Sequence, residues 1–231
     1  MRPYYQIPII ECGEPLVKIP LELFAVASPH PYQKLGANYG GNSPYYLRQS
    51  VVENLIQAQN HLQLLHPHWS IQIFDAYRPV AVQQFMVDYS FREALRERGL
   101  TEKELLPQQR EDVWTAVYEI WAVPSLDMKT PPPHSTGAAV DITLVNDVGE
   151  IVDMGSPIDE MSERSHPDYY IHSHQGYNTN RQLLRDVMLK AGFQRNPREW
   201  WHFSFGDQMW AWLYNQSHPE TVMTARYGRL S

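Results

Sequence analysis

The chain has 231 residues, of which 43% are hydrophobic and 19% are charged, with a formal net charge of −7 at pH 7. This length suits one domain with a full hydrophobic core. The acidic balance, without any cluster of Lys or Arg, argues against nucleic acid or an anionic membrane as a partner. The single cysteine, Cys12, excludes a disulfide within the chain and a structural zinc site built on cysteines.

We therefore expect a single domain over residues 1–231, with an irregular N-terminal segment over about 1–44. The N-terminus lacks the apolar stretch of a signal peptide. No apolar run approaches the roughly 20 residues that span a bilayer. These features predict a cytoplasmic protein without a membrane partner, and the sequence does not indicate an oligomeric state.

The first long element follows a loop over 32–44 that is rich in Gly, Asn and Pro. This loop either closes over a pocket or packs as an ordinary surface loop. Residues 45–65 predict a helix that ends before Pro67, because apolar side chains recur every three or four positions. The apolar stripe consists of Leu47, Val51, Leu55, Ala58, Leu62 and Leu65.

Arg78 stands between two predicted elements. Residues 71–77 predict a strand, and Pro79 suits the first turn of a helix that stops at Gly99. Functional side chains are common at such junctions. Arg78 is therefore either a functional residue or the partner of Asp75 in a salt bridge.

Two further helical segments precede the middle of the chain. Thr101 and Glu104 have the spacing of a capping box, which starts a helical turn that Pro107 interrupts. Residues 110–123 predict another helix, and we assign its apolar face to the core. That face consists of Val113, Trp114, Val117, Ile120 and Trp121.

Residues 131–137 predict a rigid segment, because three consecutive prolines lead into a turn. Residues 138–145 then alternate as a strand does, with Val140 and Ile142 on one face and Asp141 on the other. One face of this strand is therefore apolar, and the opposite face carries a carboxylate.

The C-terminal part combines turns, a long loop and regular elements. A hairpin turn at 146–149 leads to a strand at 150–154. Residues 155–176 form a long polar loop, and a loop of that length in a compact domain is usually functional or disordered. A helix at 179–190 and a strand at 200–205 follow.

Two of these strands each carry one candidate metal ligand opposite their apolar residues, Asp141 on the first and His202 on the second. If both strands belong to one sheet, the two ligands project from the same surface. His134 adds a third ligand from the turn before the first strand. Two imidazoles and one carboxylate are the ligands of a catalytic zinc ion with one position open. We therefore expect one zinc ion per chain.

Glu199 lies three residues before His202 and has the chemistry of a general base for zinc-activated water. In a strictly alternating strand these two positions face opposite sides, so Glu199 must lie before the regular strand or on a bulge. Hydrolysis also needs a positive group for the developing oxyanion, and Arg78 is the one arginine well placed at a strand end. We expect Trp201 to point into the core and Trp200 to line the pocket.

Four blocks of the sequence, in order, resemble the D-alanyl-D-alanine dipeptidases, a family related to the zinc DD-carboxypeptidases. Residues 134–141, His-Ser-Thr-Gly-Ala-Ala-Val-Asp, resemble the motif S-x-H-x-x-G-x-A-x-D, and residues 199–202, Glu-Trp-Trp-His, match E-x-W-H. Residues 74–79 resemble the segment W/F-D-x-Y-R-P, and residues 153–166 resemble a fourth block. The resemblance covers roughly residues 30–215.

The resemblance implies an α+β fold in which a central antiparallel sheet carries the zinc and helices flank it. The zinc ligands that it implies are His134, Asp141 and His202. It implies Glu199 as general base and acid, and Arg78 as stabiliser of the tetrahedral intermediate. By resemblance, Asp159 binds the free amino group of a dipeptide, a role that suits a carboxylate.

Pro132 is the one departure from the family motif. The family has Ser two residues before the first histidine, and Pro132 stands at that position here. In the family the position helps bind the substrate backbone, so Ser135 becomes the candidate to compensate in substrate binding.

These features predict a zinc dipeptidase that cleaves D-alanyl-D-alanine or a similar small dipeptide. Two alternatives stay open. One is a related DD- or LD-carboxypeptidase or endopeptidase that acts on peptidoglycan stems. The other is a zinc-binding module without catalysis, as in the hedgehog signalling domain, whose fold is similar. The presence of Glu199 and Arg78 favours an enzyme, and Asp159 favours a dipeptide as substrate.

Overall fold

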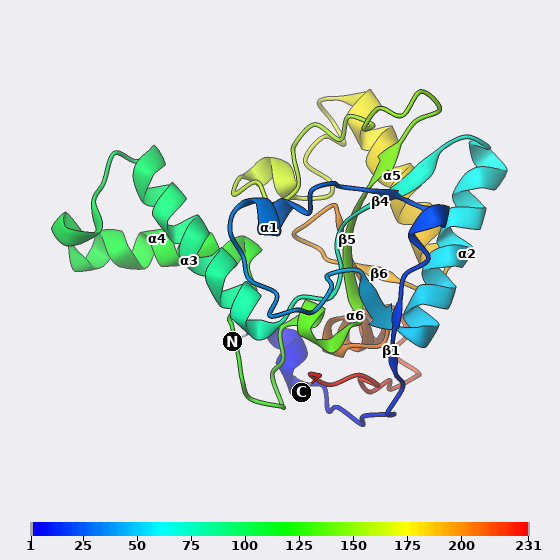
Figure 1. The fold of residues 1–231 in the computed structure, drawn as a ribbon, viewed down its shortest axis with the longest axis horizontal. Helices are drawn as coiled ribbons and strands as arrows, with labels where there is room; N and C mark the ends of the chain where they lie inside the picture. Colours follow the sequence, from blue (N-terminus) through cyan, green and yellow to red (C-terminus); the bar gives the residue numbers. More distant parts are fainter. Residues whose placement is uncertain (1, 231) are drawn as a thin grey trace.

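A five-stranded sheet forms the centre of the computed structural model, which describes residues 2–230 (Figure 1). Every neighbouring pair is antiparallel except the first, which is parallel. In order across the sheet, the strands are β2 (Ala25–Val26), β4 (Ser70–Asp75), β5 (Ala139–Val145), β7 (His202–Ser204) and β6 (Gln194–Arg195). A separate antiparallel pair consists of β1 (Leu16–Lys18) and β3 (Tyr46–Arg48).

The helices surround this sheet, and none in residues 2–230 has the length and apolar character needed to cross a membrane. The α-helices are α1 (Pro31–Lys34), α2 (Gln49–Leu65), α3 (Val80–Glu97), α4 (Pro107–Ile120), α5 (Gln175–Lys190) and α6 (Gln208–Ser217). Short 3-10 turns are η1 (Pro3–Gln6), η2 (Leu21–Leu23), η3 (Glu102–Glu104), η4 (Pro133–Thr136) and η5 (Glu163–Ser165).

The main hydrophobic core lies between one face of the sheet and the helices α2 and α5. Val140 and Ile142 of β5 are fully buried there with Leu55 of α2 and Leu184 of α5. Removing these side chains from water is the main driving force for the packing. Because side chains alternate along a strand, the same arrangement sends Asp141 to the opposite face of the sheet.

A second hydrophobic cluster joins α3 and α4, which project from the side of the sheet in Figure 1. Phe91 of α3 stacks on Trp114 of α4, with ring centroids 4.1 Å apart. Tyr32 of α1 and Trp121, just after α4, are buried in the same cluster. This cluster therefore connects the projecting helices to the polar face of the sheet.

The predicted α+β class is confirmed, with corrections to the ends of several elements. Residues 45–48 are not helical, because Tyr46–Arg48 pairs with β1 as β3. Pro107 does not interrupt a helix but begins α4, where a missing backbone N–H costs nothing. Leu65, assigned to the buried stripe of α2, is 62% exposed.

Two predicted strands are shorter than expected. Residues 150–154 make only a bridge between Val145 and Ile151, and the Met154 carbonyl accepts a hydrogen bond from Arg181 of α5 instead of from a strand. The predicted strand at 200–205 is regular only over β7. The Trp200 N–H donates to the carbonyl of Ser165 in the long loop, so that residue leaves the sheet.

Candidate metal centre and active site

Asp141 and His202 lie directly opposite each other on the neighbouring strands β5 and β7. As predicted, both stand on the polar face of one sheet, and Asp141 Oδ1 lies 3.0 Å from His202 Nδ1. Their neighbours Val140 and Phe203 are buried in the main core. These apolar residues hold the register, because a slip by one residue would turn every side chain to the wrong face.

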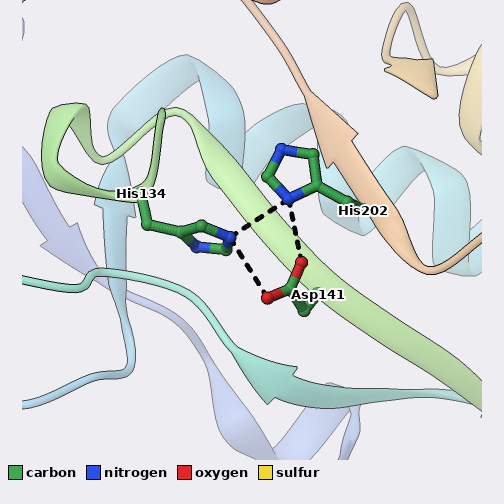
Figure 2. Close-up of side chains that lie close together, drawn as sticks. All are labelled: His134, Asp141 and His202. Atoms are coloured by element: carbon green, nitrogen blue, oxygen red, sulfur yellow. Dashed lines mark hydrogen bonds and ion pairs between the residues drawn. The ribbon is translucent and has the colours of Figure 1, made fainter. Parts of the chain in front are cut away.

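His134 approaches the same point from η4. The turn closes at Gly137, whose φ of +71° is a conformation that glycine adopts readily. His134 Nδ1 donates to the Ala76 carbonyl oxygen, 2.7 Å away. This bond orients the ring and leaves the Nε2 lone pair facing Asp141 and His202 (Figure 2).

The three side chains bring three candidate ligand atoms to a spacing that suits a zinc ion. His134 Nε2 lies 3.1 Å from Asp141 Oδ2 and 3.2 Å from His202 Nδ1. Tetrahedral donors at zinc bond lengths of about 2.0–2.1 Å would stand about 3.3 Å apart. Burial alone would raise the pKa of the Asp141 carboxyl, but the two histidines hold it well below its usual range. The donor set therefore fits a zinc ion.

The other nitrogen of His202 is oriented by Ser204 and Asp207. The Ser204 hydroxyl donates to Asp207 Oδ2 at 2.8 Å, and its oxygen lies 3.4 Å from His202 Nε2. Because the single hydroxyl proton goes to Asp207, the oxygen accepts from His202 Nε2–H. Both candidate ligand histidines, His134 and His202, thus donate from the nitrogen that points away from the other two candidate ligands, an arrangement typical of metal-binding histidines.

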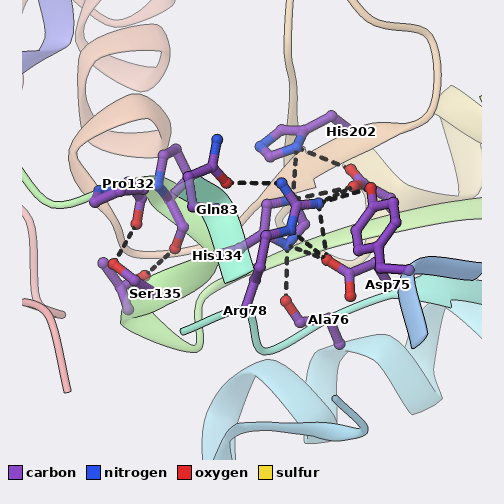
Figure 3. Close-up of polar contacts among 12 residues, drawn as sticks. Asp75, Ala76, Arg78, Gln83, Pro132, His134, Ser135 and His202 are labelled. Carbon is purple, nitrogen blue, oxygen red and sulfur yellow. Dashed lines mark hydrogen bonds and ion pairs between the residues drawn. The ribbon is translucent and has the colours of Figure 1, made fainter. Parts of the chain in front are cut away.

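Arg78 forms the salt bridge with Asp75 that the sequence left open, through Nε at 2.8 Å. Its Nη2 donates to Asp141 Oδ2 and to the Tyr32 hydroxyl, both at 3.0 Å. Its Nη1 donates to Gln83 Oε1 at 2.8 Å (Figure 3). Four of the five N–H bonds of the guanidinium are therefore engaged: one on Nε, two on Nη2 and one on Nη1. One N–H on Nη1 remains for a ligand.

A β-bulge brings Asp75 to this face of the sheet. Ile73 pairs with Ile142, but the register then shifts so that Asp75 pairs with Asp141. Bulges re-aim side chains in this way and are frequent beside active sites. The Tyr39 hydroxyl donates to Asp75 Oδ1 at 3.1 Å, so the loop at 32–44 is held by the site rather than lying over it as a separate flap.

Glu199 lies in the turn before β7, as predicted from its odd spacing to His202. Its Oε2 is 3.8 Å from His202 Nδ1. Its side chain is almost completely buried. Burial raises the pKa of the Glu199 carboxyl to about 7; the charge of His202 opposes this shift and that of Asp141 adds to it. A carboxyl group that titrates near neutrality can both take and return a proton.

Asp159 lines the same cavity as Arg78 and Glu199. Its φ of 65° is the one positive value at a non-glycine residue in the described chain, a form of strain that is frequent at functional sites. The Tyr32 hydroxyl donates to Asp159 Oδ2 at 2.8 Å and accepts from Arg78. Burial, and then the charge of Asp141, raise the pKa of the Asp159 carboxyl well above its ordinary value. A cation beside it would favour its charged form.

A cavity of about 460 Å³ connects most of the predicted residues. The predicted residues that line it are Arg78, His134, Asp141, Asp159, Glu199 and His202. Ser135 does not line it, because its hydroxyl donates to the Pro132 carbonyl at 2.8 Å (Figure 3). Trp201 is buried in the main core, as predicted, but it also lines the cavity. Trp200, which we expected to line the cavity, does not, and its indole donates to Ser156 Oγ at 3.0 Å instead.

The sequence did not reveal the residues that surround Arg78. Its guanidinium carbon lies 4.8 Å from the ring centroid of Tyr32 and 5.1 Å from that of Trp121, and such cation–π contacts favour the buried charge. Helical periodicity assigned Trp121 correctly to the core. Periodicity cannot indicate that one edge of a core side chain also faces a cavity.

The comparisons with known proteins agree with this geometry. A family model described as D-Ala-D-Ala dipeptidase matches residues 25–224. The chain belongs to the D-Ala-D-Ala dipeptidase family. It is 51% identical to the D-alanyl-D-alanine dipeptidase of Synechocystis sp. over 240 aligned positions, which cover 100% of this chain and 97% of that protein. Membership of this family identifies the chain as a peptidase.

Less similar curated proteins have the same name. The D-alanyl-D-alanine dipeptidase of Enterococcus faecalis is 33% identical, over 69% of this chain and 73% of that protein. Among solved structures, the vancomycin resistance D,D-pentapeptidase VanY in complex with Zn(II) is 16% identical, with a TM-score of 0.46 over 75% of this chain and 80% of that one.

Replacing Ser204 by Ala should weaken zinc binding roughly 10- to 100-fold, because the hydrogen bond that orients His202 is lost. Competition with a chromophoric chelator measures this affinity. Thr143→Val is the matched control, since Thr143 is buried on β5 and its hydroxyl has no hydrogen-bond partner in the described part of the chain. Equal affinities of Ser204→Ala and wild type would remove Ser204 from this role.

The raised pKa of Glu199 predicts a pH-dependent stability of the metal-free protein. Below about pH 4.5 the carboxyl is protonated in both the folded and the unfolded state. Between there and about pH 7 the unfolded state releases its proton first, so the free energy of unfolding falls as pH rises. Glu199→Gln should therefore exceed wild type by up to about 3 kcal/mol at pH 8 and match it at pH 4. Urea unfolding checks this; a pH-independent difference would contradict it.

Proposed function

We propose that this enzyme hydrolyses D-alanyl-D-alanine, or a similarly small dipeptide, to free amino acids. The observation that carries the proposal is the convergence of His134, Asp141 and His202 beside the buried carboxyl of Glu199 in one cavity. The names of the relatives support the choice of substrate. The cavity volume of about 460 Å³ lies in the range of small-molecule sites.

His134, Asp141 and His202 would hold one zinc ion per chain. When bound, the ion would polarise the scissile carbonyl and make water more acidic. Glu199 would take the proton of the attacking water and return it to the leaving nitrogen. Burial of Glu199 raises its pKa above the ordinary value, which makes the carboxylate a stronger proton acceptor.

Arg78 would stabilise the negative charge that develops on the carbonyl oxygen. Its remaining Nη1–H is the donor available for that oxygen, and its contacts with Asp75 and Gln83 hold the guanidinium in place before the substrate arrives. No reorganisation of the arginine is then needed during the reaction.

Asp159 would bind the free ammonium group of the dipeptide. The ammonium supplies the cation that this buried carboxyl lacks, and the Tyr32 hydroxyl fixes the carboxyl toward the cavity. A peptide with further residues on its amino side would carry no charge at that point. The sequence predicts a cytoplasmic location without a nucleic-acid or membrane partner.

The zinc-loaded enzyme should release D-alanine from D-Ala-D-Ala, and removal of the metal by a chelator should stop this. Glu199→Gln should lower kcat roughly 10²- to 10⁴-fold, because proton transfer is lost, while zinc content stays at one per chain. The assay compares D-Ala-D-Ala, L-Ala-L-Ala and a stem pentapeptide that ends in D-Ala-D-Ala. Cleavage of the pentapeptide alone, or full activity of Glu199→Gln, would overturn the proposal.

Asp159→Asn should lower kcat/KM for free D-Ala-D-Ala roughly 100-fold, mainly through KM, because a charge-assisted hydrogen bond to the ammonium is lost. Asn is the appropriate replacement, since it tolerates the positive φ of this position. N-acetyl-D-Ala-D-Ala has no ammonium and serves as the control substrate. If the variant keeps wild-type kinetics on the free dipeptide, Asp159 does not bind the amino group.

A further inference from the structure

The N-terminal turn η1 forms part of the wall of the active-site cavity. Arg2, Pro3, Tyr4 and Tyr5 all line it. In Figure 1 this dark-blue turn lies below the sheet, beside α6, which it contacts. A segment more than 100 residues from the nearest metal ligand in sequence thus reaches the substrate space.

The turn is held firmly in place. Arg2 Nη2 donates to the backbone carbonyls of Tyr118 and Trp121 at the end of α4. Gln208 Nε2 donates to the carbonyl of Ile7, just after the turn, at 2.7 Å. A cation at the C-terminus of a helix stabilises that helix. Stabilising α4 is therefore a sufficient structural role for the Nη2 edge of the Arg2 guanidinium.

The other edge of Arg2 and two neighbouring groups form no hydrogen bond with the described part of the chain. In residues 2–230, every hydrogen bond donated by the Arg2 side chain comes from Nη2, which leaves Nε and Nη1 without a protein acceptor. The Tyr5 hydroxyl and the Trp121 indole nitrogen are buried without a hydrogen-bond partner in the same part of the chain. All three residues line the cavity. A positive charge with two neutral donors is the chemistry that binds a carboxylate.

Arg2 differs from the second arginine of this wall. Arg198 also lines the cavity, but its Nη1 pairs with Glu119 Oε2 at 2.5 Å. Arg2 makes no ion pair with a carboxylate in the described residues. Of the two guanidinium groups, Arg2 therefore has its charge available for an anionic ligand.

The order of charges along the cavity matches a free dipeptide. Arg2 and Arg198, the residue next to Glu199 in the chain, both contact Glu119. Asp159 is instead joined through the Tyr32 hydroxyl to Arg78. In a dipeptide the ammonium lies on one side of the scissile bond, and the carboxylate lies beyond the leaving nitrogen. With the ammonium at Asp159 and the leaving nitrogen at Glu199, the carboxylate extends toward Arg2.

The residues around His134 cannot supply this contact. Pro132 and Pro133 have no side-chain donor, and the Ser135 hydroxyl is already bonded to the Pro132 carbonyl. We propose that Arg2 and Tyr5, from the N-terminal turn, bind the free carboxylate of the dipeptide substrate. The proposal rests on the proposed function and adds the residues that make the enzyme specific for a free carboxyl end.

The test compares D-Ala-D-Ala with D-Ala-D-alaninamide, which lacks only the negative charge. Wild type should prefer the acid. In Arg2→Gln the ratio of kcat/KM for acid to amide should fall roughly 10- to 100-fold, through KM, because a charged hydrogen bond is lost. Arg2→Lys should recover part of the ratio. Tyr5→Phe keeps the shape of the turn and should lower the ratio roughly three- to tenfold.

Arg198→Gln is the matched control, since it removes the other arginine of the same wall, and its ratio should equal that of wild type. A ratio unchanged in both Arg2→Gln and Tyr5→Phe would overturn the proposal. A fall in the acid-to-amide ratio of kcat/KM in Arg198→Gln, without a fall in Arg2→Gln, would also overturn the proposal. Equal losses for acid and amide would show that Arg2 only holds the turn, and would also overturn it.

Binding separates this proposal from the proposed function. Calorimetry on the zinc-loaded Glu199→Gln protein gives the affinities of the same two ligands without turnover. Tighter binding of the acid than of the amide, with the difference lost when Arg2→Gln is added, supports the carboxylate site. This holds even if the wild-type enzyme cleaves neither ligand, because that result would contradict only the dipeptidase reaction. Equal affinities, or no binding of either ligand, would overturn the carboxylate site.

Discussion

Asp141 and His202 face each other across β5 and β7, so the pairing that joins these strands also sets two candidate ligand atoms 3.0 Å apart. The apolar residues on the reverse of both strands keep this register, because any slip would bury the ligands in the core and expose core residues. His134 is then added by a proline-rich turn whose backbone is joined to the end of β4: the Arg78 N–H donates to the His134 carbonyl. The stability of the core and the geometry of the ligands are therefore one property of the sheet.

Burial gives the carboxyl groups of the site two different characters. Arg78 and then His30 hold the pKa of the Asp75 carboxyl low in spite of desolvation, and His134 and His202 do the same for Asp141. Glu199 and Asp159 lack so close a cation, and their pKa values rise. Environments that separate the pKa values of nearby carboxyls are a common way to assign acid and base roles. The charge pattern thus suggests two groups that hold the site together and two that respond to water and substrate.

Local pattern was sufficient for much of this architecture. Strand alternation correctly put Asp141 and His202 on the face opposite the core, and the parity of Glu199 correctly placed it outside the regular strand. Other features depend on contacts between distant segments and leave no local signal. The bulge that turns Asp75 toward Asp141 is one, and the insertion of Tyr32 between Arg78 and Asp159 is another. For the same reason, periodicity could not choose between Trp200 and Trp201 as the wall of the cavity.

In the proposed site, two imidazoles and one carboxylate from β5, β7 and η4 bind a single zinc ion. X-ray absorption at the zinc edge, on the protein loaded with one equivalent, measures these ligands directly. Two imidazole nitrogens with oxygen donors at about 2.0–2.1 Å are expected, and one imidazole should disappear in His202→Ala. Two imidazoles retained in His202→Ala, or a sulfur donor at about 2.3 Å, would contradict the account.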